Sequence, residues 1–165
     1  MPHEPASLYS EIAPNLFMGG TDDDDVIHYP ATHRSRTDMP FDAIVTMYAW
    51  AQPADWQVQE FRYGVPDATI SHIDLDRLKQ AVEFGYNRWL AGDCVLIRCQ
   101  AGLNRSGLVT ALILMSNGLD AESAISEIRK NRAETALCNE EYVAWLMVEG
   151  AAFILGTQQS EGEAA

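Results

Sequence analysis

One stretch of the chain, from Asp93 to Leu108, constrains the fold most strongly. It begins with an apolar run at residues 94–97, whose length and branched side chains are typical of a buried strand. From Ser106 onward apolar residues recur at helical spacing, and Asn117-Gly118 supplies a helix stop signal. The stretch therefore predicts a strand, a tight loop and a helix start in immediate succession.

The loop of this stretch, residues 99–105, is suited to binding an anion. Unbonded N–H groups and the positive end of the helix dipole make a helix start an anion site, and successive loop amides can add a nest. Gly102 permits backbone torsions that other residues resist. Cys99 at the rim would be stabilised as a thiolate nucleophile. Arg105 offers a planar fork that matches two phosphate oxygens.

The spacing of these residues resembles a known signature. Cys99, five intervening residues, Arg105 and Ser106, with Gly102 and Gly107 between a strand and a helix, are similar to the loop of the cysteine-based protein tyrosine phosphatases. The surrounding sequence resembles the compact dual-specificity branch.

Two other segments add to the resemblance. The pattern I-A-P-N-L-F-M-G at residues 12–19 is similar to the opening hairpin of that branch, and the pattern around Arg132 and Asn139 is similar to its tail. The resemblance implies one α/β domain with a central mixed, mostly parallel sheet flanked by helices. We expect a flexible tail at 1–7, the catalytic domain at 8–157 and a disordered tail at 158–165.

Periodicity and end signals predict the remaining elements. Asp120 and Asn139 are suitable N-caps for two late helices, the second reaching Phe153, and the basic residues 129, 130 and 132 suit a helix C-terminus. The expected segments are a hairpin at 10–20, strands at 41–48 and 58–65, and a helix at 75–90.

Composition limits the cellular setting and the partners. Eleven basic residues stand against 24 acidic ones, a net charge of −13, which disfavours nucleic acid as a partner. No apolar run has membrane-spanning length, so we expect no membrane association. Three cysteines, one in a catalytic-looking loop, favour a reducing cytoplasm over a disulfide framework. We expect a monomer without a cofactor or metal, and Asp22 to Asp25 as a solvated helix start rather than a metal site.

The general acid is the least certain catalytic residue from sequence. Asp67, Asp74 and Asp76 are all candidates. Asp67 follows Pro66 where a strand gives way to a loop, so it can overhang a pocket or simply shape an Asx-turn. Asp74 and Asp76 begin a helix, where capping explains them. The resemblance favours Asp67, because the family's acid lies about thirty residues before the nucleophile.

The resemblance also implies a two-step mechanism. Cys99 attacks a phosphate ester while Asp67 protonates the leaving oxygen, and Asp67 then activates water to hydrolyse the cysteinyl-phosphate. The hydroxyl of Ser106 assists departure of the thiolate, and fixed dipoles replace a metal. The expected substrate is a phosphorylated protein, or a small phosphate ester. The residues expected to bind the phosphate or another oxyanion are Gln100, Ala101, Gly102, Leu103, Asn104 and Arg105.

Several positions leave questions open. Arg98 stands where the family usually has His, and it could tune the thiolate or pair with a structural carboxylate. Cys94 or Cys138 could form a disulfide with Cys99 on oxidation. Arg34 and Arg36 could receive acidic substrate residues at the mouth of the site. Preference between phosphotyrosine and phosphoserine or phosphothreonine is not determined.

Four other functions share some of these features. An RNA 5′-triphosphatase has a similar Asn-Arg-hydroxyl-Gly run, and residues 104–107 match it. A lipid or inositol-phosphate phosphatase would use the same loop but tends to add Lys, where this loop is neutral beside Arg105. A rhodanese-like sulfurtransferase needs neither the Arg-Ser pair nor an upstream acid. A phosphopeptide-binding module would bind phosphate without turnover.

Overall fold

The structure is a computed structural model, and it describes residues 5, 7–21, 41–54 and 56–163. The expectations for Asp22 to Asp25 and for Arg34 and Arg36 lie outside these residues. A five-stranded sheet has the order β1-β2-β5-β3-β4. β1 pairs antiparallel with β2, and the other three pairings are parallel. The strands are β1 (Tyr9–Ala13), β2 (Leu16–Gly19), β3 (Ala43–Thr46), β4 (Gln59–Arg62) and β5 (Val95–Arg98).

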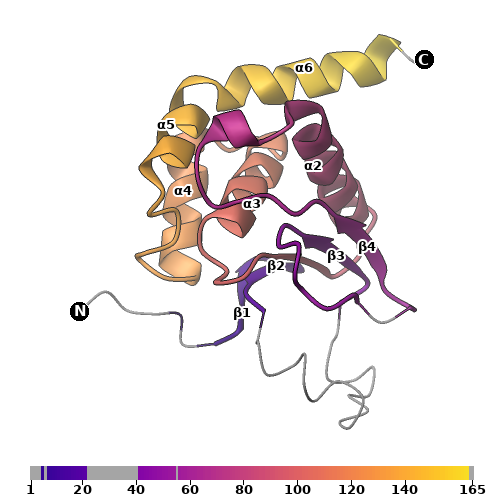
Figure 1. Cartoon of the computed structure of the whole chain (residues 1–165). Coiled ribbons are helices and arrows are strands. Elements are labelled where there is room, and N and C mark those ends of the chain that lie inside the picture. The colour runs from indigo at the N-terminus through magenta and orange to yellow at the C-terminus, as the bar shows by residue number, and fades with distance from the viewer. Residues whose placement is uncertain (1–4, 6, 22–40, 55, 164–165) are drawn as a thin grey trace, which may run out of the picture.

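The sheet is covered on one face by helices (Figure 1). A short 3₁₀ helix, η1, spans Ile70–His72. The α-helices are α2 (Leu75–Leu90), α3 (Arg105–Ser116), α4 (Ala121–Asn131), α5 (Glu140–Val148) and α6 (Gly150–Glu163). The predicted α/β class with a mixed, mostly parallel sheet is confirmed. Within the described residues no helix combines the length and apolar character needed to cross a membrane.

The central strand β5 follows the alternation of an extended chain buried on both faces. Val95 and Ile97 pack into the large core beneath the helices, whereas Leu96 joins a smaller cluster with Phe41 and Ile44 on the opposite face. Both clusters exclude water from β5, which explains its uninterrupted apolar run. Because β2, β5 and β3 are parallel, their carboxyl ends meet at one edge of the sheet.

Local signals in the sequence placed most of the helix starts. The Asp74 side chain accepts hydrogen bonds from the backbone N–H groups of Asp76 and Arg77. The Asp120 side chain accepts one from the backbone N–H of Ser123. Asn139 caps α5 in the same way, as predicted. The opening hairpin turns at Pro14-Asn15, where Asn15 adopts a φ of 65°.

The C-terminal helical segment differs from the prediction in one respect. The segment expected as one helix from Asn139 to Phe153 divides at Glu149 into α5 and α6. Gly150 lies close to the end of α3, where an added Cβ would be 3.0 Å from Met115 Cε, so the chain bends at this contact. α6 spans Gly150–Glu163, and the disordered tail expected at 158–165 stays a prediction.

Candidate active site

Cys99 follows β5 directly, at the sheet edge where the parallel strands end. Its side chain is buried, with 2% exposed, and its backbone N–H donates to Gly19 O on the neighbouring strand at 3.2 Å. The Cys99 thiol donates to Ser106 Oγ, 3.2 Å away. The hydrogen bond to Ser106 fixes the direction of the sulfur, which suits a nucleophile better than a freely rotating surface thiol.

The loop after Cys99 depends on close backbone packing at Gly102. This residue has a φ of +70°, and an added Cβ would lie 2.4 Å from Gly19 C and 2.5 Å from Gly20 N. Only glycine fits both the torsion and the space. Arg132 fixes the loop from the outside, donating from Nε to Gly102 O at 3.0 Å and from Nη2 to Ala101 O at 3.4 Å. Arg132 thus holds the carbonyls of two successive loop residues.

The start of α3 is open to an anion. Asn104 occupies the N-cap position, yet its side chain makes no capping hydrogen bond. Its amide group instead faces Asp67 and its oxygen accepts from the backbone N–H of Asn139. The first N–H groups of α3 therefore have no side-chain cap and retain their capacity to bind a phosphate oxygen.

Arg105 is the buried cation of the site, with 9% of its surface exposed. Its Nη1 donates to Val65 O at 3.1 Å, and its guanidinium carbon lies 5.4 Å from the centre of the Tyr48 ring. Its Nε has no hydrogen-bond partner among the described residues. A buried cation with an unused donor is a candidate clamp for an anionic ligand.

Asp67 lies beside the loop, as the sequence reasoning required of an acid. Its Oδ2 accepts from Asn104 Nδ2 and its Oδ1 from Asn139 Nδ2, both at 2.9 Å. Asp74, by contrast, is occupied as the N-cap of α2, and Asp76 lies in the first turn of that helix. Of the three candidate aspartates, Asp67 is the one with a hydrogen bond to the loop.

Tyr142 of α5 shares the electrostatic environment of the site. Its hydroxyl donates to Pro66 O at 3.2 Å. Burial, followed by the negative charge of Asp67, raises the pKa of Tyr142 to about 12, and the charges of Cys99 and Arg105 contribute smaller effects of opposite sign. The phenol is therefore a neutral donor throughout the neutral pH range.

Arg98 pairs with a structural carboxylate, the second of the two roles left open for it. Its Nη2 donates to Glu60 Oε2 at 3.0 Å and to Gln52 O at 2.6 Å, while Nε donates to Thr46 Oγ1 at 3.0 Å. Burial alone would raise the pKa of Glu60. The hydrogen bond from Thr46 and the charges of Arg98 and Arg62 outweigh burial and hold that pKa below its ordinary value.

The other two cysteines differ in their relation to Cys99. Cys94 precedes the same strand, five residues away, which at strand spacing is about 16 Å. A disulfide requires Cα atoms within about 7 Å, so Cys94 cannot pair with Cys99 without unfolding β5. Cys138 is exposed, and its sulfur accepts a hydrogen bond from Asn104 Nδ2 at 3.4 Å. Disulfide formation between Cys138 and Cys99 stays a prediction.

Sequence reasoning missed the structural role of Arg132. It was grouped with the helix-end charges of α4, but it is 7% exposed and burial lowers its pKa, against a smaller opposing effect of Cys99. Besides the loop carbonyls it binds Ser7 O at 2.6 Å and Ser10 Oγ at 3.1 Å. Its neighbour Arg129 does bind the carbonyls of the following turn, at Ala136 and Leu137. The sequence pattern around Arg129 and Arg132 gives no sign that their structural roles differ.

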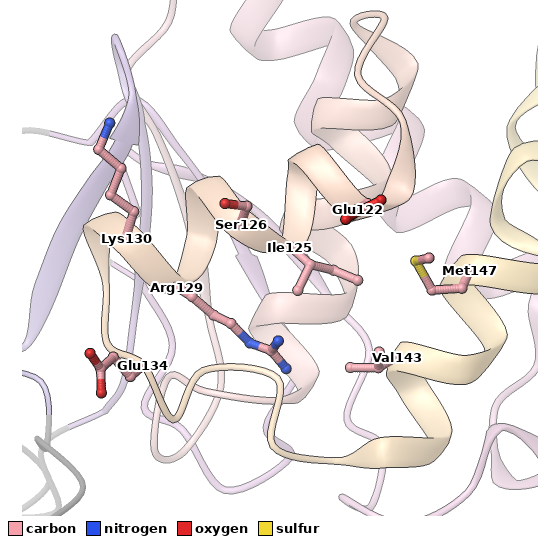
Figure 2. A pocket seen from close by; sticks show the side chains of 8 residues that line it. All are labelled: Glu122, Ile125, Ser126, Arg129, Lys130, Glu134, Val143 and Met147. Atoms are coloured by element: carbon pink, nitrogen blue, oxygen red, sulfur yellow. The ribbon is translucent and has the colours of Figure 1, made fainter.

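A separate hollow of about 530 Å³ lies between α4 and α5 (Figure 2). Apolar side chains from both helices line it together with charged side chains of α4 and the following turn, and none of the candidate catalytic residues does so. The lining residues are Glu122, Ile125, Ser126, Arg129, Lys130, Glu134, Val143 and Met147. Within the described residues no group of three or more His, Cys, Asp or Glu side chains could hold a metal ion.

The fold and the Cys-to-Arg loop together define the class of cysteine-based protein tyrosine phosphatases. The sequence model of the dual specificity phosphatase catalytic domain matches residues 31–151, most of the chain. The chain therefore belongs to the dual-specificity phosphatase family, a family of phosphoric ester hydrolases.

Solved structures show the same fold at low sequence identity. A mouse putative dual specificity phosphatase, solved with zinc tungstate, has a TM-score of 0.70 and 19% identity, covering 98% of this chain and 95% of its own. Human DUSP28 has a TM-score of 0.70 and 21% identity, covering 94% and 99%. PTPMT1 in complex with PI(5)P has a TM-score of 0.67 and 17% identity, covering 96% and 100%. No curated protein sequence matches this chain.

Proposed function

We propose that this protein hydrolyses phosphate monoesters, with phosphorylated proteins as substrates, through a cysteinyl-phosphate intermediate. The observation that carries the proposal is the convergence of Cys99, Arg105 and Asp67 on one loop at the start of α3. The family places the activity among phosphatases, and these three side chains supply the groups that a metal-free phosphoryl transfer needs.

In the first step the Cys99 thiolate forms a bond to phosphorus while the bond from phosphorus to the ester oxygen breaks. The proton of Asp67 passes to that oxygen, so that an alcohol or phenol leaves instead of its anion. Arg105 and the amides of residues 100–105 bind the phosphoryl oxygens, whose charge shifts during transfer.

In the second step the Asp67 carboxylate takes a proton from water, whose oxygen attacks phosphorus as the sulfur–phosphorus bond breaks. Inorganic phosphate and the Cys99 thiolate result. Ser106 Oγ, 3.2 Å from the sulfur, is placed to donate a hydrogen bond to the thiolate as it leaves.

The test is hydrolysis of p-nitrophenyl phosphate as a function of pH, with EDTA present. We expect wild-type turnover, none above background in Cys99→Ser, and a loss of about 10²–10⁴-fold in Asp67→Asn, the usual contribution of a general acid. Cys94→Ser is the matched control, since this half-buried thiol lies just before β5, at the end of the strand away from Cys99, and it should keep wild-type activity.

Failure of folded wild type to turn over any aryl phosphate would contradict the proposal. A Cys99→Ser protein with wild-type rates would contradict the nucleophile. Phosphotyrosine and phosphoserine peptides, PI(5)P vesicles and RNA bearing a 5′-triphosphate then compare the substrate classes. Faster turnover of lipid or RNA than of every phosphopeptide would overturn the assignment of phosphoproteins.

A further inference from the structure

Asp67 is held by a closed ring of hydrogen bonds. Both of its carboxylate oxygens accept from side-chain amides, Oδ2 from Asn104 and Oδ1 from Asn139, each at 2.9 Å. The ring is completed by the backbone N–H of Asn139, which donates to Asn104 Oδ1 at 2.9 Å. The three residues come from segments far apart in the chain: the loop after β4, the phosphate-binding loop and the start of α5.

The two asparagines are themselves anchored, so the ring has a fixed frame. Asn139 Oδ1 accepts from the N–H groups of Glu141 and Tyr142 as the cap of α5, while its Nδ2 also donates to Ala68 O at 2.8 Å. Asn104 directly precedes α3, whose first turn is buried. Residues 66–68 are thus held by Asn139 and by the Tyr142 hydroxyl before any substrate binds.

The ring leaves Asp67 able to carry a proton. A carboxyl group has about four lone-pair sites, and each oxygen here spends one on an asparagine amide. A proton can occupy a remaining site without breaking either bond. Misplacement of a catalytic group by about 1 Å can cost about 10²-fold in rate, so a side chain on a loop gains from such anchoring.

We propose that Asn104 and Asn139 are positioning residues that hold Asp67 in place to protonate the leaving oxygen. This inference rests on the proposed function, and in particular on Asp67 as the acid. Asn139 also caps α5, and its backbone N–H donates to Asn104 Oδ1, so both residues have a local structural role as well. The specific consequence is that removing either amide slows protonation of the leaving oxygen, so the loss in the first step grows as the leaving phenol becomes less acidic.

The experiment measures kcat/KM, which reports the steps up to formation of the cysteinyl-phosphate, for a series of aryl phosphates whose leaving phenols range from strongly to weakly acidic. We expect Asn104→Ala and Asn139→Ser to lower kcat/KM for phenyl phosphate by about 10- to 100-fold and for dinitrophenyl phosphate by less than about 3-fold. Serine retains an N-cap oxygen at position 139 and removes only the amide donor. Asn87→Ala, an exposed asparagine in α2, is the control and should follow wild type.

A double-mutant cycle with Asp67→Ala separates positioning from structural damage. In that background, with the acid already absent, loss of either asparagine should change kcat/KM by less than about 2-fold for every substrate. Equal losses with and without Asp67 would overturn the proposal, as would single variants whose leaving-group dependence matches wild type. Absence of aryl phosphatase activity in wild type would instead refute the proposed function itself.

Discussion

Replacing Arg98 by Met tests whether the residue before the nucleophile serves the fold or the chemistry. Methionine retains much of the volume of the arginine stem but removes its charge and three hydrogen bonds. Breaking a buried ion pair costs about 3–5 kcal/mol, because it leaves one charge uncompensated. Glu60 would keep Arg62 at 3.3 Å and the Thr46 hydroxyl at 2.6 Å. We therefore expect the lower end, a loss of about 3 kcal/mol in the free energy of unfolding.

The matched control is Arg62→Met. Arg62 contacts the same carboxylate and the same loop, with Nη2 donating to Ala51 O at 2.6 Å, but its side chain is 32% exposed against 8% for Arg98. Solvent screening limits an exposed pair to about 1 kcal/mol or less. Urea unfolding at pH 7 gives both free energies, and thermal unfolding should show a midpoint roughly 6–12 °C lower for Arg98→Met.

The pH dependence of stability gives an independent readout of the same carboxylate. The pKa of Glu60 is lower in the folded state than its ordinary value of 4.5, so the unfolded state binds more protons as the pH falls through that range. Stability from Glu60 is thus fully present above about pH 5 and lost at lower pH. Glu60→Gln should remove this part of the acid sensitivity.

Two results would refute the reasoning about Arg98. One is an Arg98→Met protein whose free energy of unfolding lies within about 1 kcal/mol of wild type, since breaking a buried ion pair should cost about 3 kcal/mol or more. The other is a shifted pH profile of kcat/KM in a fully folded Arg98→Met protein. That shift would mean that Arg98 not only pairs with Glu60 but also affects the ionisation of Cys99.

Three further changes test other parts of the site. Gly102→Ala should destabilise the protein by more than about 1 kcal/mol and abolish vanadate binding, because its Cβ would collide with Gly19; thermal unfolding and calorimetry measure the two effects. Arg132→Met leaves two loop carbonyls without their hydrogen-bond donor and should weaken vanadate binding by about 10-fold. Vanadate affinity equal to that of wild type would contradict the role of Arg132 in holding the loop. Ultraviolet absorbance should show Tyr142 titrating near pH 12. Because its pKa in the unfolded state is about 10, the free energy of unfolding should fall as the pH rises from 10 to 12, and Tyr142→Phe should lose this dependence.

The local parts of this site are encoded by residues that are neighbours in the sequence. An apolar run, a glycine-containing loop and a helical repeat follow one another without interruption, so the strand, the loop and the start of α3 could be read from neighbouring residues. The same holds for the caps Asp120 and Asn139, since capping joins residues two or three apart. Cys99 and Arg105 lie at the two ends of one short loop, so their spacing in the sequence already indicates that they are close in space.

Which distant segments meet at that loop depends on how the whole chain packs. Arg98 joins a carboxylate 38 residues away, and Asp67 bonds an amide 72 residues away. Side-chain type alone did not distinguish Arg132, buried against the loop, from Arg129, which closes the end of its own helix. Burial converts such contacts into strong constraints, and burial depends on how β4, β5, α4 and α5 pack together. That packing is a property of the whole chain, and no single segment of the sequence encodes it.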